Sequence, residues 1–125
     1  MAFHNDLGKL GEDMATQYLI KKGYSIVERN WRSGNLEVDI IAMTRTEVVF
    51  VEVKTRSDDT FMNPEDAVDW QKRRNLTIAA NHYIHYKKIN LEPRFDIISI
   101  IINDSRKEIT HFEDAFLPVS KRRRY

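Results

Sequence analysis

Two short runs of the chain carry charged side chains inside segments that otherwise have the composition of buried strands. Residues 37–43 are EVDIIAM, and residues 47–54 are EVVFVEVK. Because side chains alternate between the two faces of a strand, Glu52 and Lys54 share one face of theirs. Glu37 and Asp39 share one face of the other strand for the same reason. Acids at this spacing are suited to bind a cation, with the lysine amine close to it.

A tight turn between the two runs would bring acids from both strands together. If residues 45–46 form a two-residue hairpin loop, Thr44 pairs with Glu47, and Asp39 then lies opposite Glu52. Directly opposed side chains have Cβ atoms about 4.5–5.5 Å apart. Two carboxylates at this distance repel each other unless a proton or a cation lies between them. The pairing therefore predicts a divalent metal ion held by Asp39 and Glu52.

An ordinary surface ion pair on an edge strand is the alternative explanation for Glu52 and Lys54. The run from Val48 to Val53 argues against it, because only Glu52 interrupts its apolar character, as in a central strand that is covered on both faces. Burying a charge there costs on the order of several kcal/mol unless the charge is well paired. Charges kept at that cost are often functional, but structural ion-pair networks also keep them, so both explanations stay open.

Glu12, in the first predicted helix, extends this set to three acids and one amine. Hard ions such as Mg²⁺ or Mn²⁺ prefer oxygen ligands. Such an ion polarises a phosphoryl oxygen and lowers the pKa of bound water. We expect Lys54 to orient that water or to neutralise developing charge, and Glu12 to hold a water from the helix side. With Asp39 and Glu52 as ligands, the set predicts a catalytic site for phosphodiester hydrolysis.

Periodicity and turn residues predict the elements that position these side chains. Apolar residues recur at helical spacing over about 5–22, and a second helix is predicted from Asn63, as N-cap, to about Tyr86. Strands are predicted at 24–30, 36–43, 47–55, 94–102 and 107–112. Short connections favour antiparallel pairing of the first three strands, and a helical crossover makes the third and fourth parallel. The order α-β-β-β-α-β-β predicts an α/β fold with a mixed central sheet flanked by helices.

Length and composition limit the class of protein. The 125 residues are expected to form a single domain, 1–118, followed by a basic tail, 119–125. The absence of cysteine excludes disulfides and thiolate metal sites. No apolar stretch approaches the roughly 20 residues that span a bilayer, and the N-terminal residues lack the features of a signal peptide. We therefore expect a cytoplasmic protein without a membrane partner.

The formal net charge of +1 conceals local basic clusters. Lys72, Arg73 and Arg74 fall inside the second predicted helix. Together with Arg56 they are predicted to contact the backbone of a nucleic acid, which makes binding independent of sequence and sensitive to salt. The basic run at 121–124 is equally compatible with a solvated tail.

Other notable side chains are expected to have structural roles. Asp96 interrupts an apolar strand and is expected to pair with a basic residue. His82 and His85 lie three residues apart in a helix, but no third ligand has motif spacing, so surface or packing roles are expected. Trp31 and Trp70 could stack on bases, although large aromatic residues more often lie in the core or at its boundary.

At these positions the sequence resembles the PD-(D/E)XK nuclease superfamily. More closely, it is similar to a bacterial family of uncharacterised, endonuclease-like proteins related to archaeal Holliday-junction resolvases. The matching segments occur in the family's order and span most of the chain: GEDMA at 11–15, NWR at 30–32, EVDIIA at 37–42, VFVEVKTR at 49–56 and RFDII at 94–98.

The resemblance implies a restriction-endonuclease-like core of α-β-β-β-α-β. It implies Asp39 and Glu52 as metal ligands, Lys54 as the catalytic lysine and Glu12 as an assisting acid, with Mg²⁺ or Mn²⁺ as cofactor. It also implies DNA as the partner, with branched or junction DNA as a candidate substrate. A homodimer is expected from related resolvases, because a junction offers two scissile strands.

Two functional hypotheses follow. The leading one is a metal-dependent deoxyribonuclease, and the alternative is a catalytically inactive module on the same fold that binds nucleic acid or a protein. The sequence departs from the pattern at Val38, where the superfamily name has proline, and at Leu36, where the family usually has glycine. Both departures leave the acids and the lysine intact.

Overall fold

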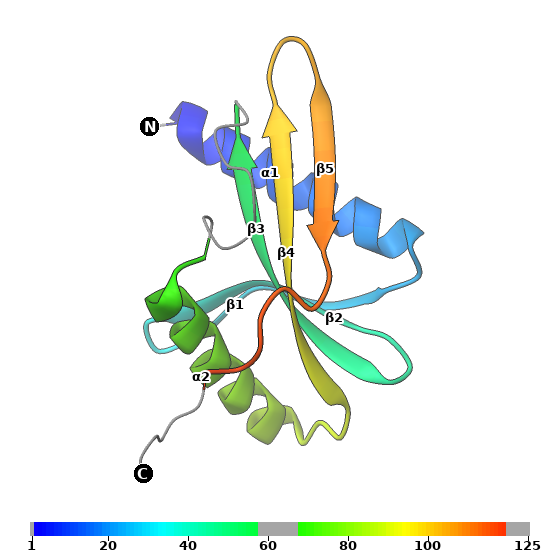
Figure 1. Ribbon diagram of the computed structural model, residues 1–125, viewed down its shortest axis with the longest axis vertical. Coiled ribbons are helices and arrows are strands. Elements are labelled where there is room, and N and C mark those ends of the chain that lie inside the picture. Colours follow the sequence, from blue (N-terminus) through cyan, green and yellow to red (C-terminus); the bar gives the residue numbers. More distant parts are fainter. Residues whose placement is uncertain (1, 58–67, 120–125) are drawn as a thin grey trace.

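A five-stranded mixed sheet, with one helix packed on each face, organises the molecule (Figure 1). The computed structural model describes residues 2–57 and 68–119. Its elements are α1 (Ala2–Lys21), β1 (Ser25–Ser33), β2 (Leu36–Met43), β3 (Glu47–Arg56), α2 (Trp70–Lys87), β4 (Glu92–Ile102) and β5 (Lys107–Phe112). The strands lie in the order β1-β2-β3-β4-β5, with β3 and β4 parallel and the other pairs antiparallel. The predicted fold class and element order are confirmed.

Two tight turns set the register of the first three strands. In the β1–β2 turn, Ser33 pairs with Leu36, and Gly34 has a φ of 61°, a conformation that glycine adopts without strain. In the β2–β3 turn, the Thr44 N–H donates to the Glu47 carbonyl at 2.9 Å. The predicted hairpin register is therefore confirmed from the pair of Met43 with Val48 to the pair of Ile40 with Val51, where the ladder ends.

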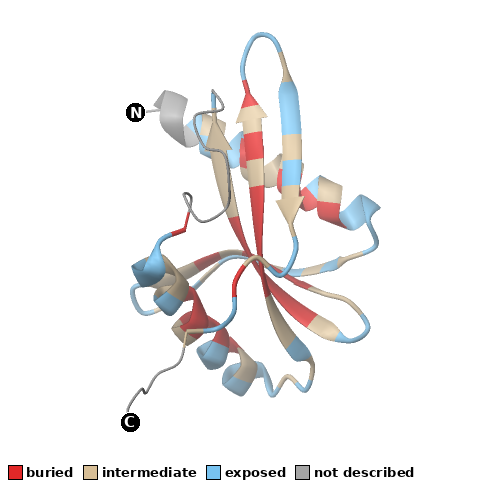
Figure 2. Ribbon diagram, viewed as in Figure 1, coloured by how far each residue is buried: buried red, intermediate tan, exposed pale blue. Residues whose placement is uncertain are grey.

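The two faces of β3 and β4 belong to separate hydrophobic cores. On one face, Phe50 and Phe95 pack with Tyr83 of α2. On the other, Val51 and Ile98 pack with α1. Burial is concentrated along the middle of β3 and β4 (Figure 2). Coverage on both faces explains why these strands are almost continuously apolar, as predicted for a central strand.

Helix α2 begins later than predicted. Trp70 is its first residue, and the Asp69 side chain caps the helix by accepting the backbone N–H of Lys72 at 2.9 Å. The predicted N-cap, Asn63, lies outside the described residues, but Val68 and Asp69 are not helical. A start at Asn63 with an unbroken helix is therefore wrong, because Asp is as effective an N-cap as Asn.

Neither helix within residues 2–57 and 68–119 has the length and apolar character needed to cross a membrane.

Candidate functional site

The site lies where β2 and β3 separate. Their ladder ends at the pair of Ile40 with Val51, and Asp39 is the next residue of β2. The Val53 N–H donates to Asp39 Oδ2 at 2.8 Å, so the carboxylate satisfies a backbone donor that the ladder no longer serves. On β3, Glu52 follows Val51, and its side chain is only 6% exposed. The end of the ladder therefore sets one acid on each strand beside the gap.

Electrostatics show that these acids influence each other. Burial raises the pKa of Asp39 to about 7, and the neighbouring charge of Glu52 adds to the effect. Burial also raises the pKa of Glu52, although Lys72 and Lys54 oppose that rise. Glu12 raises the Asp39 pKa further. A bound cation, in addition to these lysines, would favour the ionised forms of the carboxylates.

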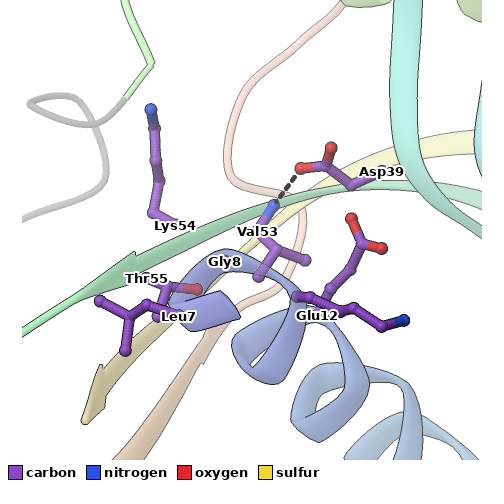
Figure 3. A pocket seen from close by; sticks show the side chains of 8 residues that line it. Leu7, Gly8, Glu12, Asp39, Val53, Lys54 and Thr55 are labelled. Atoms are coloured by element: carbon purple, nitrogen blue, oxygen red, sulfur yellow. Dashed lines mark hydrogen bonds between the residues drawn. The ribbon is translucent and has the colours of Figure 1, made fainter. Parts of the chain in front are cut away.

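Glu12, Asp39 and Lys54 line one open pocket of about 430 Å³. In Figure 3, α1 passes on one side of β3 with the Glu12 carboxylate directed toward Asp39, while Lys54 extends on the other side. Glu52 is not part of this lining, and its carboxylate lies 3.6 Å from Lys72 Nζ of α2. The four predicted residues thus lie around the same end of β3, but the structure brings only three of them into one pocket.

Two residues of β1 hold Glu12 in place, and sequence reasoning gave neither of them a role. Arg29 Nη2 lies 3.1 Å from Glu12 Oε1, and Asn30 Nδ2 donates to the same oxygen at 2.9 Å. Asn30 has a φ of 53°, in the left-handed region where asparagine is enriched among residues other than glycine. Because asparagine tolerates this backbone conformation, Asn30 is a sequence feature that could have suggested the contact with Glu12.

Gly11 allows α1 to approach β3 closely beside the site. A Cβ at Gly11 would overlap Oγ1 of Thr55, whereas a Cβ at Gly8 would meet no atom within 4 Å. Gly11, unlike Gly8, is therefore a position at which α1 tolerates no side chain without a shift of Thr55. Its neighbour Glu12 is brought to the sheet by this contact.

Lys72, whose contact with nucleic acid stays a prediction, forms an ion pair at the site. Its Nζ lies 3.6 Å from Glu52 Oε2, and its side chain is 43% exposed. The capping interaction between Asp69 and the Lys72 N–H fixes the turn from which the side chain reaches. Sequence reasoning missed this ion pair, because nothing in the local pattern relates the start of α2 to the face of β3.

The other residues predicted to contact nucleic acid differ in their contacts with the rest of the protein and in their exposure. Arg73 donates from Nε to the Val68 carbonyl at 3.1 Å, and its guanidinium lies 5.7 Å from the centre of the Phe116 ring. Arg74 is exposed, and Arg56 is half-buried near the end of β3. Contact of these residues with nucleic acid stays a prediction, and the basic run at 121–124 lies outside the described residues.

The aromatic and histidine predictions have mixed outcomes. Trp31 packs edge-on against Tyr83, with ring centres 5.0 Å apart, as expected of a residue at the core boundary. Trp70 is 59% exposed, so the expectation of a core or boundary position is wrong for it, because it precedes the turns of α2 that face the sheet. His82 Nδ1 lies 2.8 Å from Ser33 Oγ, and His85 Nδ1 lies 3.0 Å from a carbonyl of its own helix, which agrees with surface roles.

Asp96 pairs with basic residues, which confirms the prediction for it. Arg94 Nη2 lies 2.8 Å from its Oδ2, and His111 Nε2 lies 2.7 Å from the same oxygen. The backbone N–H of Asp114 donates to Oδ1 at 2.9 Å. Because an ionised carboxylate only accepts hydrogen bonds, His111 Nε2 carries a proton in this contact.

The donors around Asp39 fit a hard divalent cation. In the part of the chain that the structure describes, no group of three or more His, Asp or Glu side chains forms a complete metal-binding set. Two carboxylates completed by water are, however, the usual protein contribution to a Mg²⁺ site. The contacts with Val53 and Lys72 use Asp39 Oδ2 and Glu52 Oε2, so the second oxygen of each acid is the candidate ligand.

The fold and the site define a mixed α/β protein with paired buried acids at one end of its central strand. The chain belongs to the uncharacterised protein family UPF0102, whose model matches residues 11–100. This span contains every acid and lysine described for the site.

Relatives in the same family cover nearly the whole chain. A UPF0102 protein of Parabacteroides distasonis is 47% identical over 93% of this chain and 96% of its own length. One from Porphyromonas gingivalis is 46% identical over 98% and 92%, respectively. One from Flavobacterium psychrophilum is 49% identical over 93% and 98%. The similarity to these relatives therefore covers at least 93% of this chain.

Proposed function

We propose that this protein is a metal-dependent endonuclease that hydrolyses phosphodiester bonds in DNA, as the resemblance of its motifs to the PD-(D/E)XK superfamily implies. The observation that carries the proposal is the pair of buried acids, Asp39 and Glu52, whose pKa values are raised by burial and whose contacts with Val53 and Lys72 each use one carboxylate oxygen. A divalent cation relieves the repulsion between such acids. Lys54 beside them adds the charge that phosphate chemistry requires.

Each side chain has a distinct role in this proposal. Asp39 and Glu52 would hold Mg²⁺ or Mn²⁺, which supplies polarisation of the scissile phosphate when bound. The Lys54 ammonium neutralises negative charge that develops on the phosphoryl oxygens. Glu12 is fixed by hydrogen bonds from β1, so its carboxylate can accept a hydrogen bond from the attacking water in a constant orientation.

DNA binding is supported by exposed side chains near the start of α2, the helix that carries Lys72. Arg74 is exposed on α2, and Trp70 exposes more than half of its side chain at the start of the same helix. Exposed basic side chains attract the phosphate backbone regardless of sequence, and an exposed indole can stack on a base that is not paired. Branched DNA, which contains unpaired or distorted bases, is therefore the proposed substrate class.

The decisive experiment is a cleavage assay on supercoiled, linear, single-stranded and four-way-junction DNA with Mg²⁺ or Mn²⁺. We expect wild type to cut at least one substrate, and Asp39→Ala and Lys54→Ala to lose about a hundredfold or more of the rate. Glu92→Ala and Lys87→Ala are matched controls, because both residues are exposed and belong to the opposite ends of β4 and α2. These controls are expected to cut at the wild-type rate.

Two results would overturn the endonuclease proposal. Cleavage that persists in Asp39→Ala would mean that a contaminant or another site is responsible. Binding of DNA by wild type without cleavage under any metal condition would favour the inactive binding module instead. Homodimer formation is tested in the same samples by measuring the mass of the protein, alone and bound to a junction.

A further inference from the structure

Lys72 differs from its neighbours Arg73 and Arg74 in where its charge is used. Arg73 is bound to the Val68 carbonyl, and Arg74 is exposed. Lys72 instead reaches the buried Glu52, with Nζ 3.6 Å from Oε2. Its charge also acts on Asp39, although more weakly than Glu52 does. Lys72 is thus the residue of this basic cluster that interacts with both acids of the site.

The partners of this ion pair are unequally buried. The Glu52 side chain is 6% exposed, whereas that of Lys72 is 43% exposed. A lysine ammonium is a compact charge on a flexible stem of four carbons, so it can leave an acid by changing rotamers while its helix stays in place. The long, half-exposed contact is weaker than a bidentate pair between buried groups. Lys72 therefore has both the reach and the freedom to exchange with another cation.

We infer that Lys72 is a positioning residue of the site, which neutralises Glu52 before metal binding, yields the acid to a divalent cation, and then contacts a substrate phosphate. The inference rests on the proposed function, because it takes Asp39 and Glu52 as the metal ligands. The driving force is electrostatic. An ammonium beside Glu52 repels an arriving cation, and a bound divalent cation repels the ammonium toward solvent and the phosphates of DNA.

The first test measures Mn²⁺ affinity without DNA, by calorimetry and by electron paramagnetic resonance of free Mn²⁺. Lys72→Met removes the competing charge, so we expect it to bind Mn²⁺ about three- to tenfold more tightly than wild type. Arg74→Met, the matched control two residues along the same helix, should bind like wild type. Lys72→Arg restores the charge and should return the affinity to within about twofold of wild type.

The second test measures affinity for junction DNA with and without Ca²⁺, under conditions that give no cleavage. Lys72→Met should weaken DNA binding only when Ca²⁺ is present, because only then is the wild-type ammonium released to a phosphate. Arg74→Met should weaken binding equally in both conditions. A lysine with a purely structural role would not produce this dependence on the metal.

The outcomes separate this inference from the proposed function. If wild type binds no Mn²⁺, the proposed function itself fails. If wild type binds Mn²⁺ while Lys72→Met and Arg74→Met have equal affinities, the inference about Lys72 is overturned and the metal site stands. Circular dichroism establishes that each variant is folded, and Lys72→Gln, with the same expected tightening, replaces the methionine variant if that one is not.

Discussion

Asp96 and Glu52 are buried acids on neighbouring central strands, yet their surroundings are opposite. In the parallel β3–β4 ladder, Asp96 pairs with Val51, and Glu52 pairs with Ile97, so the acids are one step apart and on opposite faces of the sheet. The Asp96 side chain is fully buried, and that of Glu52 is 6% exposed. Similar burial therefore allows the effect of their partners to be compared.

The hydrogen-bond and ion-pair partners decide whether the pKa of each buried acid is lowered or raised. Burial alone would raise the pKa of Asp96, but hydrogen bonds from His111 and Arg94 outweigh it and lower the pKa. Burial raises the pKa of Glu52, and the contact with Lys72 does not compensate. An acid that is fully satisfied inside the protein has a structural role, whereas an acid left short of partners is suited to bind something else.

The largest effect should come from breaking the satisfied acid. Asp96→Asn removes the charge that Arg94 and His111 both contact, while Arg94 keeps Glu47 as an acidic partner, so the free energy of unfolding should fall by about 3–5 kcal/mol in chemical denaturation. In wild type the Asp96 contribution is complete above the unfolded pKa and is lost as pH falls through the lowered folded pKa. Wild-type stability in this variant at neutral pH would refute the structural role of the network.

Adding a metal that binds Asp39 and Glu52 should stabilise the folded protein. With Mn²⁺ at about 100 times its dissociation constant, the free energy of unfolding should rise by about 2.7 kcal/mol. Asp39→Asn and Glu52→Gln should lose this gain, as measured by thermal melts with and without Mn²⁺. If either variant keeps the full gain, Mn²⁺ binds elsewhere and the contrast between the two regions loses its functional meaning.

A matched pair of glycines tests the packing that brings Glu12 to the site. Gly11→Ala should lower the free energy of unfolding by about 2 kcal/mol, because the added methyl group overlaps Thr55 on β3. Gly8→Ala should raise it by up to about 1 kcal/mol, because open space surrounds that position and alanine favours a helix. Equal effects of the two substitutions in urea denaturation would contradict the close approach of α1 to β3.

A pH-dependent gain in stability should come from removing an unsatisfied charge. Between pH 4 and about pH 7 the folded protein retains a proton on Asp39 that the unfolded chain releases, so this residue lowers stability as pH rises through that window. Asp39→Asn removes this penalty, and a pKa difference of about three units corresponds to roughly 3–4 kcal/mol, so the free energy of unfolding should rise by that amount at pH 8 without added metal. Near pH 4 the variant and wild type should be equally stable, and a gain that is independent of pH would argue against a raised Asp39 pKa.

The sequence could predict the parts of the fold and site that depend on neighbouring residues. The nearly continuous apolar run of β3 identified a covered central strand, and the two-residue turn after Thr44 fixed the register of β2 with β3 up to the residues before Asp39 and Glu52. Both features depend on the period of a strand and the geometry of a short turn, which are local properties. The start of α2 was predicted less well, because two nearby residues were both good caps.

By itself, the sequence determined which acids and lysines could form a site and on which faces of their strands they lie. Only the tertiary structure decided that Lys72 pairs with Glu52, that β1 fixes Glu12, and that Asp96 is satisfied while Asp39 is not. Each of these contacts joins residues that are far apart in the sequence and that meet only when the helices and strands pack together. Local patterns fix faces and registers, but the distance between a charge and its partner depends on how the completed elements pack.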